Sequence, residues 1–200
     1  MHDHTSAQDG RDPVDLVILQ AMARHLDKYL SRDRVYLPMA VDTPEGPKWP
    51  TMSIGAMLMR LARLRARADA LSPEQRASLK EIEEEMERAR RWYPDAYRDR
   101  AVREISSLIH SWRWFLDDCY GNIERCREVY PAEARIRTTI QLLVDHLGES
   151  EVPAQTREQI WLLDNRLHGH FQPGEFIWPP ELASVFPRSR FWWLYGMPSG

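Results

Sequence analysis

The stretch that decides the fold is residues 95–122, DAYRDRAVREISSLIHSWRWFLDDCYGN, the longest uninterrupted amphipathic run in the chain. At about 100° per residue, one broad face of a helix collects its apolar residues. These are Ala101, Val102, Ile105, Leu108, Ile109, Trp112, Phe115, Leu116 and Cys119. A face this wide predicts a core helix around which the rest of the chain is organised.

The opposite face of this helix carries a charged row with a tryptophan beside it. Arg103, His110 and Asp117 follow one another at steps of seven, and Trp114 lies next to them. A tryptophan on the side away from the core needs a cover. The C-terminal arm is one candidate, and a partner protein or a second copy of the chain are the others.

Composition favours one domain with no strong electrostatic preference. Two hundred residues, 43% of them hydrophobic, are enough for a single core. The formal charge of −3 gives no field that would attract nucleic acid or an anionic membrane. The arginine row Arg60, Arg63, Arg65 and Arg67, with Arg188 and Arg190, leaves nucleic-acid binding a lesser possibility, because Glu81–Glu87 follow the row closely.

The two cysteines, Cys119 and Cys126, lie seven residues apart. Without a CxxC pair or a signal peptide they indicate free thiols in a reducing compartment, not a disulfide or a structural zinc site. The sequence contains no apolar run of membrane-spanning length and no export signal. We therefore expect a cytoplasmic protein with no membrane contact and no cofactor.

Helical periodicity predicts an all-α fold, an antiparallel helical bundle of about six helices. A loose tail at 1–12 precedes a bundle domain at 13–170, and an aromatic, Pro-rich arm follows at 171–200. Prolines every few residues between 34 and 50 predict an extended strap with a turn at residues 42–46. The expected helices are 13–31, 53–70, 73–93, 95–122, 131–147 and 153–168.

The second and third expected helices should form a hairpin. Ser72 with Gln75 three residues on is a capping box, and Pro73 suits the first helical position. Across this short turn, Arg60, Arg63 and Arg67 are expected to face Glu81, Glu84 and Glu85. The segments 87–94 and 124–131 also resemble each other at a spacing of 37 residues, which we interpret as two similar helix-Tyr-Pro-helix corners.

The C-terminal arm concentrates aromatic residues among prolines that forbid a continuous helix. Such a segment either packs on its own bundle or docks on a partner, because aromatic and arginine side chains are favoured at interface hot spots. The expected partner-binding residues are Trp114, Trp178, Phe186, Arg188, Arg190, Phe191, Trp192, Trp193 and Tyr195. A small-ligand pocket lined by Trp112, Trp161 and arm aromatics is a further possibility.

Arg103 and His110 resemble the pair used by HEPN ribonucleases, in which a histidine follows an arginine after four to six residues. In that chemistry the histidine moves the proton of the ribose hydroxyl and the arginine stabilises the charged phosphorane. Asp117, one heptad further, could orient the imidazole. The spacing here is seven, so a solvated or ion-paired row is the competing interpretation.

Two histidine clusters carry the ligand types that zinc prefers. One is Asp164 with His168 and His170, and the other is the terminal segment 2–4, His-Asp-His. Neither supplies three convergent ligands locally. The function favoured by the sequence is therefore a non-catalytic interaction or accessory protein that binds a protein partner, or a second copy, through the central helix and the arm; the alternative is a metal-independent ribonuclease.

Overall fold

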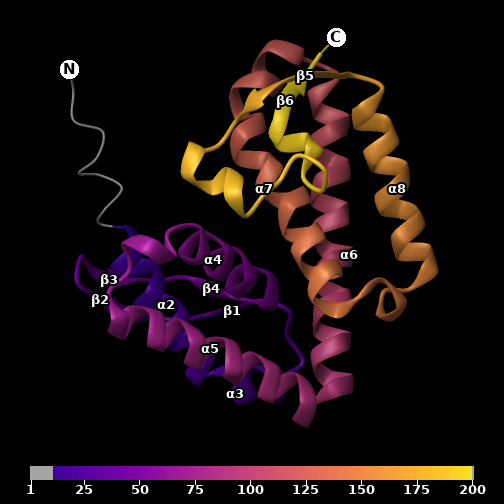
Figure 1. The fold of residues 1–200 in the computed structure, drawn as a ribbon. Helices are drawn as coiled ribbons and strands as arrows, with labels where there is room; N and C mark the ends of the chain where they lie inside the picture. The colour runs from indigo at the N-terminus through magenta and orange to yellow at the C-terminus, as the bar shows by residue number, and fades with distance from the viewer. Residues whose placement is uncertain (1–10, 200) are drawn as a thin grey trace, which may run out of the picture. The chain divides into compact units, whose positions relative to one another are not determined.

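The computed structural model describes residues 11–199, and most of this chain is helical (Figure 1). The contacts divide it into two compact units, which meet between Arg100 and Ala101. This division falls inside the helix predicted to organise the fold, whereas the sequence predicts one bundle domain. Of the predicted tail at 1–12, residues 1–10 lie outside the described residues.

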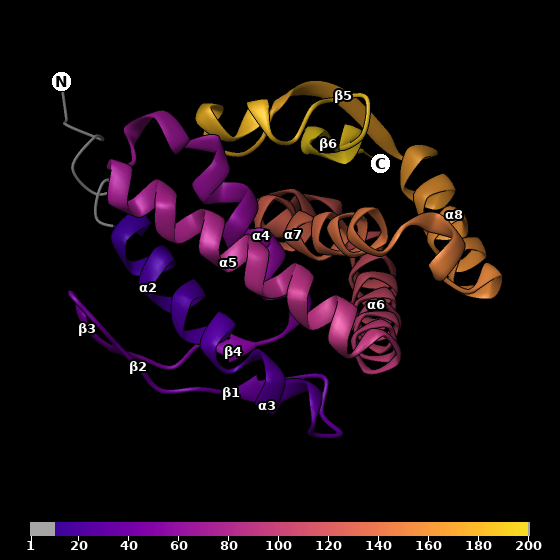
Figure 2. The same ribbon diagram turned by 60° about the horizontal axis from the view of Figure 1, so that its bottom comes forward.

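Among the described residues, four α-helices lie wholly within unit 1. They are α2 (Arg11–Arg24), α3 (Leu26–Leu30), α4 (Ile54–Ala66) and α5 (Pro73–Trp92). Helix α2 packs against both α4 and α5, and α5 lies beside α2 in both ribbon views (Figures 1 and 2). The first expected helix is divided at His25, so that α2 and α3 are separate elements.

The caps of α4 and α5 explain where these helices begin. The Ser53 hydroxyl accepts a hydrogen bond from the Ala56 amide at 3.1 Å. At α5 the Ser72 hydroxyl accepts from the Gln75 amide, while the Gln75 side chain accepts from the Ser72 amide at 2.8 Å. The predicted capping box is therefore confirmed, because both reciprocal bonds are present.

The predicted pairing of Arg60, Arg63 and Arg67 with Glu81, Glu84 and Glu85 is wrong. Asp15 of α2, which is half-buried, pairs with Arg63 at 2.7 Å and with Arg60 at 3.4 Å. Glu84 and Glu85 instead pair within α5, with Lys80 and Arg88 respectively. Between α4 and α5, Arg65 pairs with Glu83 at 2.9 Å. A half-buried carboxylate on α2 attracts the guanidinium groups more strongly than exposed glutamates do.

The Pro-rich strap after α3 forms two small antiparallel sheets. Strand β1 (Leu37–Pro38) pairs with β4 (Thr51–Met52), and β2 (Val41–Thr43) pairs with β3 (Gly46–Lys48). Gly46 has φ +98 at the predicted turn, a conformation that favours glycine. The predicted turn at residues 42–46 is confirmed, because it joins β2 to β3.

Unit 2 contains most of α6 (Pro94–Cys119), with α7 (Ile123–Leu147) and α8 (Ala154–His168). The predicted apolar face of α6 is confirmed, since seven of its nine members are buried and Val102 and Leu108 are half-buried. Ring contacts join α6 to α7, with Trp112 and Phe115 packed near Tyr130. These rings form the centre of the core of unit 2.

A helix boundary predicted at Pro131 is wrong, because α7 continues through it. Asn122 caps α7 nine residues earlier, accepting from the Arg125 amide at 3.1 Å. An internal proline costs about 3 kcal/mol. Burial of Cys126, Tyr130 and Ala134 on one continuous face offsets that cost. The second of the two similar corners is therefore not a corner.

The C-terminal arm is ordered and packs within unit 2. Strand β5 (Phe171–Phe176) pairs antiparallel with β6 (Tyr195–Pro198). Between them lie two 3-10 helices, Pro180–Ser184 and Trp192–Leu194. The second 3-10 helix and β6 both contact α7. The arm lacks a continuous helix, as predicted, but it contains an antiparallel strand pair that the sequence does not indicate.

Candidate interaction surface

Trp193 fixes the arm to α7 through its ring, its indole N–H and its backbone carbonyl. Its side chain is 1% exposed, and its indole N–H donates to the Thr138 hydroxyl at 3.0 Å. Its backbone carbonyl accepts from the Tyr130 hydroxyl at 2.7 Å. The guanidinium of Arg137 lies 4.0 Å from the ring centroid, a close cation–π contact. Trp193 is therefore part of the core of unit 2.

Arg137 also joins α7 to α8, a role that sequence inspection missed. It is 3% exposed, and its Nε and Nη2 atoms donate to the two carboxylate oxygens of Asp164 at 2.6 and 2.8 Å. Gln141 accepts a further bond from Nη2 at 3.2 Å. A buried charge needs such pairing, so this network holds α8 against α7. One sequence feature could have indicated this role: Arg137 follows Tyr130 by seven residues, which places both on one face of the helix.

The remaining aromatic residues of the arm pack on one another and on α7. Trp178 donates its indole N–H to the carbonyl of Pro131 at 2.7 Å and is half-buried. Phe186 and Phe191 are buried and meet edge to face at 5.1 Å. Phe186 also accepts a hydrogen bond at its carbonyl from Tyr195 at 2.9 Å. These residues hold the arm in place. Phe186 and Phe191 are buried, so they are not accessible to a partner as predicted.

The outer residues of the arm remain accessible. Arg188 is exposed and lies 5.7 Å from the Tyr195 ring, whereas Arg190 pairs with Asp145 of α7, Nε to Oδ2 at 2.7 Å. Trp192 is half-buried and meets His168 edge to face at 5.1 Å. Of the predicted partner-binding residues in the arm, those with accessible surface are Trp178, Arg188, Arg190, Trp192 and Tyr195.

Trp114 is 73% exposed on α6, in a row with exposed His110, Arg113 and Asp117. The expectation that the arm covers this tryptophan is wrong. The physical reason is that the arm is held on α7 by Trp193 and its hydrogen bonds, and the exposure of Trp114 shows that none of residues 11–199 covers it. Helix α6 therefore has one buried apolar face and one exposed face that carries a large aromatic ring.

Helix α8 adds two further exposed apolar side chains, Trp161 at 61% and Leu162 at 53%. Asp117 of α6 pairs with Arg166 of α8, so the two helices are tied together near their C-terminal ends. Trp112 is buried and Trp161 is exposed. The two therefore do not line one pocket, as the sequence had suggested they could.

The predicted ribonuclease residues lie on the exposed face of α6. Arg103, His110 and Asp117 are all exposed, and Asp117 pairs with Arg166. Among the described residues His110 makes no hydrogen bond or ion pair. The proposed orienting contact of Asp117 with the imidazole is therefore not formed.

The predicted metal ligands near the end of α8 do not converge. Asp164 is bound by Arg137, His168 meets Trp192, and the ring of His170 lies 4.8 Å from that of Tyr120. Within residues 11–199 no group of three or more His, Cys, Asp or Glu side chains is placed to hold a metal ion. The terminal segment 2–4 lies outside the described residues.

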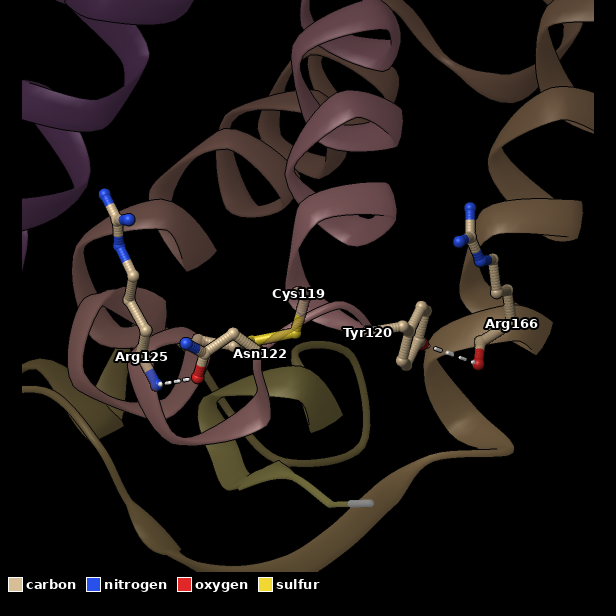
Figure 3. The surroundings of a disulfide bond; sticks show 6 residues. Cys119, Tyr120, Asn122, Arg125 and Arg166 are labelled. Carbon is tan, nitrogen blue, oxygen red and sulfur yellow. Dashed lines mark hydrogen bonds between the residues drawn. A yellow bond between two sulfur atoms is a disulfide. The ribbon is translucent and has the colours of Figure 1, made fainter.

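The two cysteines form a disulfide, which contradicts the predicted free thiols (Figure 3). Cys119 ends α6 and Cys126 lies in the first turn of α7, with their Cα atoms 4.8 Å apart and both side chains buried. Gly121 and Asn122 reverse the chain between them, so a spacing of seven brings the thiols together. Spacing alone did not reveal this turn.

Tyr120 lies beside the disulfide and anchors this end of unit 2. Its hydroxyl donates to the carbonyl of Arg166 at 3.1 Å, and the Arg166 guanidinium lies 4.9 Å from its ring (Figure 3). Burial raises the pKa of Tyr120. Burial, together with the negative charge of Asp164, raises the pKa of Tyr130 well above its ordinary value. Both phenols therefore act as neutral donors at physiological pH.

No protein family, curated protein or solved structure matches the chain. Across residues 11–199, no helix is both long enough and apolar enough to cross a membrane. What the molecule does must therefore be inferred from its own surface, where the exposed face of α6 is the most distinctive feature.

Proposed function

We propose that the chain is a non-catalytic interaction or accessory protein that binds a protein partner through the exposed face of α6, centred on Trp114. The supporting observation is a tryptophan that is 73% exposed on a helix whose other face packs in the core. Large exposed aromatic rings contribute strongly to binding because they bury much area at little conformational cost. Trp161 and Leu162 of α8 are further exposed apolar side chains within the same unit.

In this proposal the arm acts as a rigid part of the surface. Arg188 and the half-buried rings of Trp178, Trp192 and Tyr195 are accessible to a partner, while Phe186, Phe191 and Trp193 act by holding the arm in place. A preorganised surface loses less entropy on binding than a free segment would. As the scaffold we propose the antiparallel helical bundle that the sequence predicts.

The experiment that tests this function is capture of proteins from native lysate by immobilised wild-type protein and by two tryptophan variants. Trp114→Ala should lose the captured protein, and Trp92→Ala, on α5 and 67% exposed, is the matched control that should retain it. Both substitutions remove an exposed ring and should leave folding intact. Equal capture by wild type and Trp114→Ala would contradict the proposal.

The ribonuclease alternative is tested separately. If Arg103 and His110 cleave RNA without a metal, His110→Ala should abolish cleavage without unfolding, because His110 is exposed. Absence of cleavage by purified wild-type protein at several pH values would end this alternative. The accessory function does not depend on the result.

The predicted cytoplasmic location needs a direct test because of the disulfide. Most cytosolic proteins keep their thiols reduced, so a stable Cys119–Cys126 bond favours an oxidising compartment. Alkylation of free thiols in intact cells, followed by mass measurement, distinguishes the two. Labelled thiols in vivo would support the cytoplasm, and protected thiols would support an oxidising compartment.

A further inference from the structure

An open groove in unit 1 runs between α2 and α5, with a volume of about 430 Å³. Helices α2 and α5 lie side by side in the views of Figures 1 and 2. A groove of this size falls within the range of small-ligand sites. Its lining residues are Gln20, Ala23 and Arg24 of α2 and Ser78, Glu81, Ile82 and Glu85 of α5.

The base of the groove is apolar and one part of it is bridged by a hydrogen bond. Ala23 and Ile82 are buried, with 6% and 4% of their surface exposed. The Gln20 side-chain amide donates to the Ser78 hydroxyl at 2.8 Å, joining the two helices. This bridge fixes the separation of the helices, so the groove is formed in the absence of a ligand.

The walls carry opposite charges that are not paired with each other. Arg24 donates from Nε to the carbonyl of Gln20 at 3.3 Å, which leaves its two terminal nitrogens available. Glu81 makes no hydrogen bond or ion pair with any described residue, while Glu85 pairs with Arg88 at 2.8 Å. Arg24 and Glu81 line the same groove without pairing, so each is available to one charge of a ligand that carries both.

We propose that this groove binds a free α-amino acid with a short aliphatic side chain. The ligand carboxylate pairs with the Arg24 guanidinium, whose planar donors suit a carboxylate. The ligand ammonium pairs with Glu81, assisted by Glu85, and the aliphatic side chain rests on Ala23 and Ile82. A diamine would be repelled by Arg24, and a dicarboxylate by the two glutamates.

The test is isothermal titration of the full chain with L-valine and L-leucine, compared with isobutylamine and isovalerate. These analogues retain the aliphatic group but carry one charge each. We expect saturable binding of an amino acid in the millimolar range or tighter, and affinity lower by about tenfold or more for each analogue. Equal affinity for an amino acid and a singly charged analogue would overturn the proposal, as would no binding of either amino acid.

Two variants locate the site. Arg24→Gln and Glu81→Gln should each weaken amino-acid binding by about tenfold or more, because each removes one charge pair. The matched control is Glu84→Gln on the same helix, since Glu84 is exposed, pairs with Lys80 at 3.7 Å and does not line the groove. All three positions are on the surface, so the variants should fold. Unchanged affinity in both groove variants would place any binding elsewhere and overturn the proposal.

Discussion

The strap of unit 1 and the arm of unit 2 are both Pro-rich and non-helical, yet they are held very differently. In the strap Trp49 is 75% exposed and the strands are two or three residues long. In the arm Trp193 is 1% exposed, with its ring, its N–H and its carbonyl all in contact with α7. Proline stops helices in both segments. Whether the resulting loop becomes core depends on where its aromatic rings find partners.

The most direct test of this difference between strap and arm is to remove one aromatic ring from each segment. Trp193→Ala should lower the free energy of unfolding of unit 2 by about 3–5 kcal/mol, because a buried ring and its hydrogen bonds are lost. Trp49→Ala in the strap should change stability by no more than about 0.5 kcal/mol. Denaturant titration followed by circular dichroism measures both. Similar losses in the two variants would show that the strap is also core.

A second pair of substitutions compares glycines. At Gly196 of β6, with φ +149, an added Cβ would collide with the Gln172 carbonyl oxygen and lie 2.7 Å from the Phe171 ring. Gly196→Ala should therefore cost about 3 kcal/mol, from backbone strain and overpacking together.

The matched variant lies in the strap. Gly46 has φ +98 but nothing within 4 Å of an added Cβ, so Gly46→Ala should cost about 1 kcal/mol, from backbone strain alone. Thermal unfolding monitored by circular dichroism compares the two. A smaller loss of stability for Gly196→Ala than for Gly46→Ala would mean that the β5–β6 strand pair accommodates the added Cβ at little cost.

Reduction of the disulfide should weaken unit 2, which contains both cysteines. A loop closed between Cys119 and Cys126 is short, and its opening should lower stability by about 2 kcal/mol on the chain-entropy estimate. The measurement is the denaturation midpoint with and without a phosphine reductant. The double variant Cys119→Ala/Cys126→Ala serves as control and should not respond to the reductant. An unchanged midpoint in the wild type would mean that the bond adds no stability.

The smallest effect concerns the hydroxyl that holds the backbone of the arm. Tyr130→Phe should cost about 1 kcal/mol at neutral pH, because the hydrogen bond to Trp193 is lost. The pKa of Tyr130 is raised above its ordinary value of 10.0. The unfolded chain therefore loses this proton at lower pH than the folded chain, and stability should fall as pH rises above about 10.

The pH dependence gives this prediction its own control. Tyr130→Phe should show a weaker loss of stability above the ordinary tyrosine pKa than the wild type does, with Tyr120 retaining part of the effect because its pKa is also raised. Denaturant titrations at several alkaline pH values provide the comparison. Identical alkaline slopes would show that Tyr130 is not held neutral by the fold.

The sequence by itself determined the features that depend on neighbouring residues. The capping box at Ser72 and Gln75, the turn at Gly46 and the apolar face of α6 all follow from short-range spacing, because each involves residues within one or two helical turns. The type of the main elements could be predicted for the same reason. The candidate site was predicted only in part. Trp114 was correctly placed away from the core, but the prediction that the arm covers it was wrong.

Only the tertiary structure decided how distant groups meet. Asp15 attracts Arg60 and Arg63 from another helix, Arg137 finds Asp164, and Cys119 finds Cys126 across a sharp turn. The continuous buried face of α7 likewise overrode Pro131. In each case the deciding free energy comes from burial and pairing between segments, which local pattern does not encode. Trp114 stays exposed, whereas Trp193 of the arm is buried on α7.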